Sequence, residues 1–391
     1  MSKPSVNLPR FKMQRNFKLL TEDKLKLALA KNIALQNVMQ CTDSNIVAQT
    51  INDELNSIID LIAPASRCMT NKLNQPYLSS VLREEMAEAH RLLTTAISSK
   101  DKDDWRYYTN KRNKMNKNID KAKSEYLLSK LNNNRQCWRD LKSYNGLNKA
   151  CTPSKIMDGG RVVTSPKVIA NIANQHYLDK ISKLNKAMEG EIRDPMALLT
   201  KLIPRNQTNI FVLGQISMRE TFSMINYLPN TTSTGFDSVS NRIIKKLGWS
   251  IVPQICHMIN CVVRTATFPE IFKLTRIIPV SKPGKPTDNI DSFRPLNNLS
   301  ALEKLVEQWI KKCFVGWLEG GNIISGDHHG ERQGYSTLTA MTQIKQQISK
   351  NIQSKNYNIL LTTGLSAAFD TIDHMTFLRK VEHYGVRGKE L

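Results

Sequence analysis

The chain has 391 residues, which exceeds the usual size of a single hydrophobic core and favours two or three domains. Its 56 lysines and arginines against 34 aspartates and glutamates give a net charge of +22, an excess that bears on partners rather than on fold. The charge favours nucleic acid as the partner, with an anionic membrane surface or a merely basic soluble protein as alternatives.

Cysteine spacing and hydropathy argue against several other classes. The seven cysteines are scattered, with no Cys-x-x-Cys pair and no clustered histidines, which argues against a zinc site and against a disulfide framework. The sequence has no uncharged apolar run of about 18 residues that could span a bilayer, and no apolar signal core at the N-terminus. We therefore expect a reducing compartment, the nucleus or the cytoplasm, and no membrane partner.

Residues 1–150 are predicted to be helical and basic. Between residues 105 and 149 the chain carries 12 Lys/Arg and 3 Asp/Glu, with aromatic residues interleaved among the cations. Rings that stack on bases and cations that neutralise phosphates are typical of sites for RNA or single-stranded DNA. The alternative is a solvated helix whose aromatic side chains pack inward. The aromatic residues are Trp105, Tyr107, Tyr108, Tyr126, Trp138 and Tyr144, and the candidate RNA-binding cations are Lys111, Arg112, Lys114, Lys117, Lys121 and Lys123.

Residues 151–207 are predicted to form a helix followed by a polar linker. A turn-rich stretch at 153–161 leads to Ser165-Pro166, an N-cap followed by proline at the first helical position. Further along, residues 217–220 and 300–303 both have the Ser-x-x-Glu pattern of a capping box. Each of these boxes should therefore begin a helix.

Three later segments carry the residues that bear on chemistry. Residues 233–240 contain Gly-Phe-Asp and precede a helix. Residues 267–296 indicate a short β-branched strand, a Lys-Pro-Gly-Lys turn at 282–285 and then the start of a second regular element. Cations on such a turn suit a polyphosphate, although most turns of this kind are solvated loops. Residues 360–374 indicate a strand that ends near Thr363, then a small-residue turn and a short helix.

Five ordered blocks resemble the reverse transcriptases of non-LTR (LINE-type) retrotransposons, particularly the jockey-like branch. The resemblance is specific from about residue 208 onward. It reaches more loosely back to residue 1, where the basic helical stretch is similar to the linker that precedes the family's polymerase. The blocks are the Gly-x-Asp box at 235–237, the Phe-Pro to Arg-Pro-Leu block at 268–296, the Arg-x-Gly-x-Ser-Thr box at 329–337, the palm box at 364–374 and Tyr-Gly-Val-Arg-Gly at 384–388.

This resemblance implies an α+β fold in which a mostly helical basic region precedes partial reverse-transcriptase fingers and the first palm strand. The expected regions are a helical pre-polymerase linker at 1–150, a helix and linker at 151–207, fingers at 208–350 and the start of the palm at 351–391. The implied family reaction is RNA-directed DNA synthesis with Mg²⁺. The implied partners are RNA and single-stranded DNA.

The resemblance also assigns roles to individual residues. Lys282 or Lys285, Arg294 and Arg332 match basic finger residues that hold the incoming nucleotide and the template. Phe369 matches the aromatic gate that excludes the ribose 2′-hydroxyl. These roles are chemically sensible, because cations bind phosphates and a ring can exclude a hydroxyl group by its bulk.

Departures from the family pattern bear on activity. Gly364 stands where the family has its first metal-binding aspartate, and no Ala-Asp-Asp box occurs before Leu391. Two-metal phosphoryl transfer needs carboxylates that hold the cations, so we expect no metal site, no cofactor and no catalytic residue in this chain. We expect a truncated polymerase copy without activity. The alternatives are a non-catalytic nucleic-acid-binding or interaction protein derived from a mobile element, and one piece of a longer active enzyme.

Overall fold

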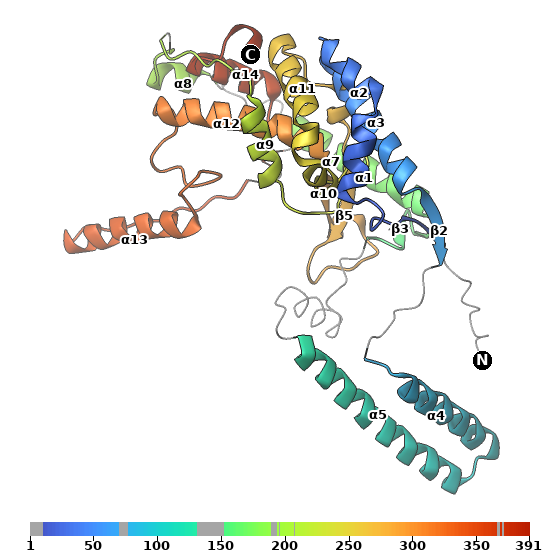
Figure 1. Cartoon of the computed structure of the whole chain (residues 1–391). Coiled ribbons are helices and arrows are strands. Elements are labelled where there is room, and N and C mark those ends of the chain that lie inside the picture. Colours follow the sequence, from blue (N-terminus) through green and yellow to red (C-terminus); the bar gives the residue numbers. More distant parts are fainter. Residues whose placement is uncertain are drawn as a thin grey trace. The chain divides into compact units, whose positions relative to one another are not determined.

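The computed structural model describes residues 11–69, 77–130, 152–188, 194, 196–206, 208–365, 368–369 and 371–391. The chain folds as two compact units (Figure 1). The first unit comprises Met1–Gln14 and Ala65–Cys151, and the second comprises Arg15–Pro64 and Thr152–Leu391.

The first unit is built on a hairpin of two long helices, α4 (Ser80–Ser99) and α5 (Lys102–Lys130), which lie side by side in Figure 1. The Ser79 hydroxyl caps α4 by accepting a hydrogen bond from the Leu82 amide. Leu82, Ala89 and Ala96 are buried at seven-residue spacing, so one apolar line runs along α4. Two short strands, β1 (Phe11–Arg15) and β2 (Ala65–Met69), pair with each other.

The second unit is mostly helical. Its helices are α1 (Glu22–Ala30), α2 (Ile33–Asn37), α3 (Ser44–Ile62), α7 (Pro166–Met188), α8 (Ala197–Leu202), α9 (Met218–Tyr227), α10 (Asn241–Leu247), α11 (Val252–Thr265), α12 (Ala301–Gly320), α13 (Thr337–Gln353) and α14 (His374–Tyr384). Short 3₁₀ helices lie at Val38–Gln40, Gly248–Ile251, Glu270–Lys273, Ile290–Ser292 and Gly388–Glu390.

Two antiparallel strand pairs accompany these helices. The short strands β3 (Ile156–Asp158) and β4 (Arg161–Val163) form the first pair. The second pair is β5 (Arg276–Ser281) with β6 (Phe293–Asn298), in a register that places Val280 opposite Arg294. The β-branched strand expected after residue 275 is thereby confirmed.

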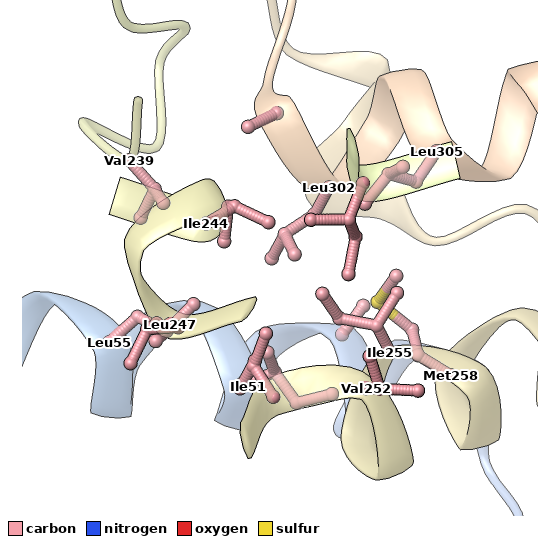
Figure 2. Packing of buried hydrophobic residues seen from close by; sticks show 14 of the residues in the cluster. Ile51, Leu55, Val239, Ile244, Leu247, Val252, Ile255, Met258, Leu302 and Leu305 are labelled. Atoms are coloured by element: carbon pink, nitrogen blue, oxygen red, sulfur yellow. The ribbon is translucent and has the colours of Figure 1, made fainter. Parts of the chain in front are cut away.

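The hydrophobic core of the second unit joins segments that lie far apart in the sequence. Figure 2 shows Ile51 and Leu55 of α3 close to side chains of α10 and α11, with Leu302 of α12 in the same cluster. These side chains are fully or almost fully buried. The apolar residues of α3 recur every three or four positions, which is the period that places them on one face of a helix.

The segment at residues 15–64 therefore belongs to the core of the second unit, whereas the sequence pattern predicted it to be part of the basic region 1–150. Hydrogen bonds reinforce the packing. The Ser44 hydroxyl donates to the Thr267 carbonyl at 2.9 Å, and the Lys246 ammonium donates to the Leu20 carbonyl at 2.5 Å. Hydrophobic patterning alone does not reveal which distant helices share a core.

The expected strand before Thr363 is absent, and this prediction was wrong. Residues 356–365 are irregular, and Ile359 and Leu361 are 96% and 85% exposed. A strand is stabilised by a partner that satisfies its backbone groups, and no described residue pairs with this segment.

The described chain is thus mixed α and β with helices predominating, which agrees with the expected α+β class at this coarse level. Within its described part, no helix is both long enough and apolar enough to cross a membrane.

Candidate nucleic-acid interface

Two of the predicted RNA-binding lysines on α5 are already engaged by neighbouring side chains. The Lys111 ammonium lies 2.9 Å from a carboxylate oxygen of Glu88 on α4. This hydrogen bond raises the pKa of Lys111 above its usual value. Lys123 lies 3.5 Å from an Asp120 carboxylate oxygen and 5.8 Å from the centre of the Tyr77 ring. Both lysines contribute to the helix hairpin itself.

Other cations of α5 are exposed on one side of the helix, which we call the outer cation row: Arg106, Lys114, Lys117 and Lys121. Their spacing corresponds to steps of three, four or eight residues, which places them on a common face. Among the described residues, Arg106, Lys114 and Lys117 have no hydrogen-bond or ion-pair partner, whereas Lys121 lies 4.0 Å from Glu125. With a rise of about 1.5 Å per residue the row is roughly 22 Å long. Arg106 was not among the predicted cations.

The remaining predicted cation of α5, Arg112, is exposed outside this row. Its guanidinium lies 5.7 Å from the centre of the Tyr108 ring and 3.1 Å from the Asn113 side-chain oxygen. These contacts keep its side chain along the helix, but they do not neutralise its charge.

The aromatic residues of this region divide between the two alternatives considered above. Tyr126 packs against Tyr77 with ring centres 6.4 Å apart, and half-buried Tyr108 packs edge-on against Trp105 at 6.0 Å. Tyr107 is exposed next to the outer cation row. Trp138 and Tyr144 lie outside the described residues.

A second group of predicted cations lies at the loop end of the β5–β6 hairpin. The Lys282 ammonium donates to the Asp291 carbonyl at 2.6 Å, which closes the loop between the strands. Lys285 is exposed on the adjoining turn, where Gly284 adopts a φ of 71° that favours glycine. Arg294 is exposed and has no hydrogen-bond or ion-pair partner among the described residues. The hairpin therefore brings these three cations to one end.

The base of the hairpin is held by the Gly-x-Asp box and the start of α12. A Cβ atom on Gly235 would lie 2.6 Å from the Ser300 amide nitrogen, so only glycine fits this approach. Asp237 accepts a hydrogen bond from the Ser300 hydroxyl at 2.5 Å. The Asn298 side chain donates to the Thr234 carbonyl at 2.5 Å, which ties β6 to the same box. This box positions the hairpin rather than carrying an exposed functional group.

Two carboxyl groups are buried at this junction. Burial raises the pKa of Glu303 to about 7, although its hydrogen bond from the Ser300 amide acts in the opposite direction. Burial also raises the pKa of Asp237, against the effect of the Ser300 hydroxyl. One oxygen of Asp237, Oδ1, is buried without a hydrogen-bond partner. Both acids therefore favour the protonated form more than exposed carboxyls do.

Arg332 is engaged within its own loop. Its guanidinium binds both carboxylate oxygens of Glu319 at 2.6 Å and lies 4.3 Å from the centre of the Tyr335 ring. It also donates to the carbonyl of Ser325 at 3.0 Å. A bidentate arginine of this kind fixes geometry strongly, so Arg332 anchors residues 321–336 to the end of α12. No local sequence pattern indicates Glu319 as its partner.

The described residues of the palm box form no cluster that could hold the Mg²⁺ that the resemblance implies. Nothing lies within 4 Å of the position of a Cβ atom on Gly364, and Asp370 lies outside the described residues. Asp373 caps α14 by accepting a hydrogen bond from the Thr376 amide at 2.7 Å. Hydrogen bonds from the side chain and the backbone of Thr376 lower the pKa of Asp373. In the described part of the chain, no three His, Cys, Asp or Glu residues are grouped suitably for a metal ion. Phe369 is exposed. The described residues by themselves do not complete a two-metal centre.

Curated proteins that match the chain are polymerases of Drosophila mobile elements. The chain is 23% identical over 350 residues to the probable RNA-directed DNA polymerase from transposon BS of Drosophila melanogaster, covering 85% of this chain and 38% of that protein. It is 29% identical over 153 residues to the probable RNA-directed DNA polymerase from transposon X-element, covering 39% of this chain and 17% of that protein. It is 25% identical over 170 residues to the RNA-directed DNA polymerase from mobile element jockey of Drosophila melanogaster, covering 44% of this chain and 19% of that protein.

These matches confirm the likeness to jockey-like polymerases that the sequence blocks predict. The chain spans less than two fifths of the length of each of these relatives. No protein-family model matches the chain.

Proposed function

Because this chain is related to the RNA-directed DNA polymerases of non-LTR transposons, we propose that it binds RNA and single-stranded DNA as a fragment of such a template-copying enzyme. The outer cation row of α5 supplies a sequence-independent contact to the phosphate backbone. Lys282, Lys285 and Arg294 at the hairpin supply a second set of contacts, to nucleotide and template.

The observation that carries this proposal is the outer cation row. Its cations lie on one face of a continuous helix and are mostly unpaired within the described residues, while Lys111 and Lys123 of the same helix are paired. Unpaired cations in line neutralise successive phosphates and release counterions from the strand, and this release makes the binding salt-dependent. Exposed Tyr107 beside the row adds a ring on which a base can stack.

The same helix supplies a matched test. The full chain is titrated with a short single-stranded RNA at several salt concentrations, as wild type, as Lys114→Gln/Lys117→Gln and as Lys111→Gln/Lys123→Gln. Both variants lose two positive charges from α5. We expect the first variant to reduce the slope of log K against log salt by about 1.4, since each phosphate contact on a single strand contributes about 0.7.

The second variant should change the slope much less, because its lysines already face carboxylates. Circular dichroism of each variant checks that the helices remain folded. Equal slopes for the wild type and the Lys114/Lys117 variant would show that the row does not meet phosphates.

A second candidate function is a nucleic-acid-binding or interaction protein that has no role in synthesis. Gly364 favours this candidate, since a glycine has no side chain to hold a cation at the position where the family has an aspartate. The two candidates share the binding surfaces and differ in catalysis. The assay that separates them is primer extension.

A further inference from the structure

Two cysteines that lie 220 positions apart in the sequence meet where the start of α3 approaches α11. Cys41 follows the 3₁₀ helix Val38–Gln40 and is half-buried, whereas Cys261 is fully buried on α11. The Cys261 sulfur lies 3.7 Å from the carbonyl oxygen of Cys41. Both cysteines carry free thiols. This pair is separate from the cations to which nucleic-acid binding is assigned above.

Two donors converge on the Cys261 sulfur. The Arg264 guanidinium lies 3.1 Å from it, and the Nε2 atom of His257 lies 3.4 Å from it. The same Nε2 atom is 2.8 Å from the Cys41 carbonyl oxygen, which can only accept, so Nε2 carries a proton. An arginine beside a thiol stabilises the negative charge of a thiolate, which is the nucleophilic form of cysteine. The surroundings of Cys261 therefore suit a sulfur that attacks.

Cys41 suits the complementary role of the sulfur that is oxidised first. Its side chain is partly accessible to solvent, so a small oxidant reaches it without opening the core. The Cys41 sulfur lies 3.8 Å from the Asp43 carbonyl oxygen, and a thiol is a weak donor, so this contact does not hold the side chain firmly. The backbone of Cys41 is extended and lies between two helical elements, which allows a local adjustment toward α11.

We propose that Cys41 and Cys261 are a redox modification site, at which hydrogen peroxide forms a reversible disulfide. Peroxide first converts the Cys41 thiol to a sulfenic acid and releases water. The Cys261 thiolate then attacks the Cys41 sulfur, so that the S–S bond forms and the S–O bond breaks. The hydroxide that leaves combines with the proton that Cys261 gives up. Two thiols are oxidised, one peroxide is reduced, and one disulfide and two waters result.

This disulfide ties the segment at residues 15–64 covalently to α11. The two parts already share a hydrophobic core, so the bond adds a covalent link to an existing contact. In a reducing compartment a disulfide of this kind is transient and responds to oxidant. Cysteine spacing gives no indication of the pair, because its members come together only in the folded chain.

The test begins with the wild-type chain, which is treated with hydrogen peroxide, alkylated in denaturant and digested with trypsin. We expect two free thiols fewer than the seven of the reduced chain. We also expect a linked pair of peptides, 32–67 with Cys41 and 247–264 with Cys261. Dithiothreitol should separate these peptides and restore all seven thiols. The melting temperature should rise on oxidation and return on reduction, because the bond closes a long loop in the unfolded chain.

Cys256→Ser is the matched control. Cys256 is also buried on α11 and lies in the same tryptic peptide, but its sulfur contacts the Ile216 carbonyl at 3.4 Å. This variant should keep the linked peptides, whereas Cys41→Ser and Cys261→Ser should each lose them together with the rise in melting temperature. The wild-type peptide map decides the question even where a serine disturbs folding. Linkage through Cys256, linkage between two chains, or oxidation without linkage would overturn the proposal.

Arg264→Gln tests which sulfur attacks. Arg264 is exposed, so the substitution should leave the fold intact, but it removes the cationic donor from the Cys261 sulfur. Dimedone, which traps sulfenic acids, should label Cys41 several-fold more in this variant than in the wild type, because the attack by Cys261 is slower. Equal labelling of the two proteins, or a label on Cys261 in place of Cys41, would overturn the assigned roles.

Discussion

At the scale of single residues, the Gly-x-Asp box explains why a glycine is needed in front of α12. Gly235 has no positive φ that would call for glycine, so its requirement comes from close approach. The neighbouring atoms are backbone atoms of Leu299 and Ser300, at 2.6 to 2.9 Å from the position of a Cβ atom. Backbone atoms cannot move aside as the end of a flexible side chain can.

Gly235→Ala should therefore destabilise the second unit by at least about 2 kcal/mol, in the range of overpacking substitutions. The measurement is chemical denaturation followed by tryptophan fluorescence. The matched control is Gly316→Ala inside α12, where nothing lies within 4 Å of the new methyl group. Alanine is the better helix former, so the control should be neutral or stabilising by up to about 1 kcal/mol. Equal stability of the two variants would contradict the close approach.

The buried carboxyl of Glu303 predicts a pH dependence of stability. Its folded pKa of about 7 lies above the ordinary 4.5, because burial, Glu307 and Asp237 oppose its charge more than Ser300 and Lys304 favour it. The folded state thus holds the proton more tightly than the unfolded state. This contribution to stability is complete below about pH 4.5 and is lost as the pH rises through about 7.

The free energy of unfolding of the wild type, measured by denaturation, should be lower at pH 8 than at pH 5. Glu303→Gln should reduce this difference by at most about 3 kcal/mol. Glutamine keeps an oxygen that can accept from the Ser300 amide, so the helix cap should remain. The raised pKa of Asp237 acts in the same direction, so the variant should keep a smaller decline in the free energy of unfolding between pH 5 and pH 8. An unchanged pH dependence in the glutamine variant would show that Glu303 is not the titrating group.

At the scale of elements, local signals predicted several helix starts correctly. Ser217 and Ser300 form complete capping boxes at the start of α9 and α12, and α7 begins at Pro166. These signals are reliable because the hydrogen bonds that they require lie within one turn. The packing of α3 into the core and the pairing of Arg332 with Glu319 depend on distant partners, which no local pattern contains.

The same reasoning explains the strand that the sequence predicted wrongly. Ile359, Leu360 and Leu361 have the composition of a strand, as Ile277 and Ile278 of β5 do. Strand β5 is paired with β6, whereas residues 356–365 have no strand partner among the described residues. Composition specifies what a strand can be made of, and pairing decides whether one forms.

Amide hydrogen exchange should separate these two segments. We expect residues 358–363 to exchange at rates close to those of an unstructured chain, since no backbone ladder protects them. Interior amides of β5 that face β6 serve as the control of similar composition and should exchange more slowly. Protection at 358–363 equal to that of α11 would mean that this segment acquires a partner in solution.

At the scale of the whole molecule, the positive charge is distributed over two compact units. The outer cation row belongs to the first unit, and the hairpin cations belong to the second. Net charge and composition were sufficient to suggest nucleic acid, because they sum over the chain. They could not distinguish Lys114 from Lys111, since that distinction depends on the position of Glu88 on a neighbouring helix.

The last prediction concerns catalysis by the chain as a whole. Primer extension on an RNA template, with Mg²⁺ or Mn²⁺, should give no product above a control without protein. Such transfer needs cations that carboxylates hold near both the attacking and the leaving oxygen. The described residues supply no such group, and Gly364 contributes no ligand.

Gly364→Asp has room for the new side chain and should fold normally, yet it should remain inactive because one added carboxylate does not complete a two-metal site. Both proteins should still bind the primed template, which an electrophoretic shift verifies and which separates failed catalysis from failed binding. Extension by the wild type would show that cations are held by residues that the structure does not describe. Extension by the variant alone would place the missing function at residue 364 and make the chain a polymerase that lost a single carboxylate.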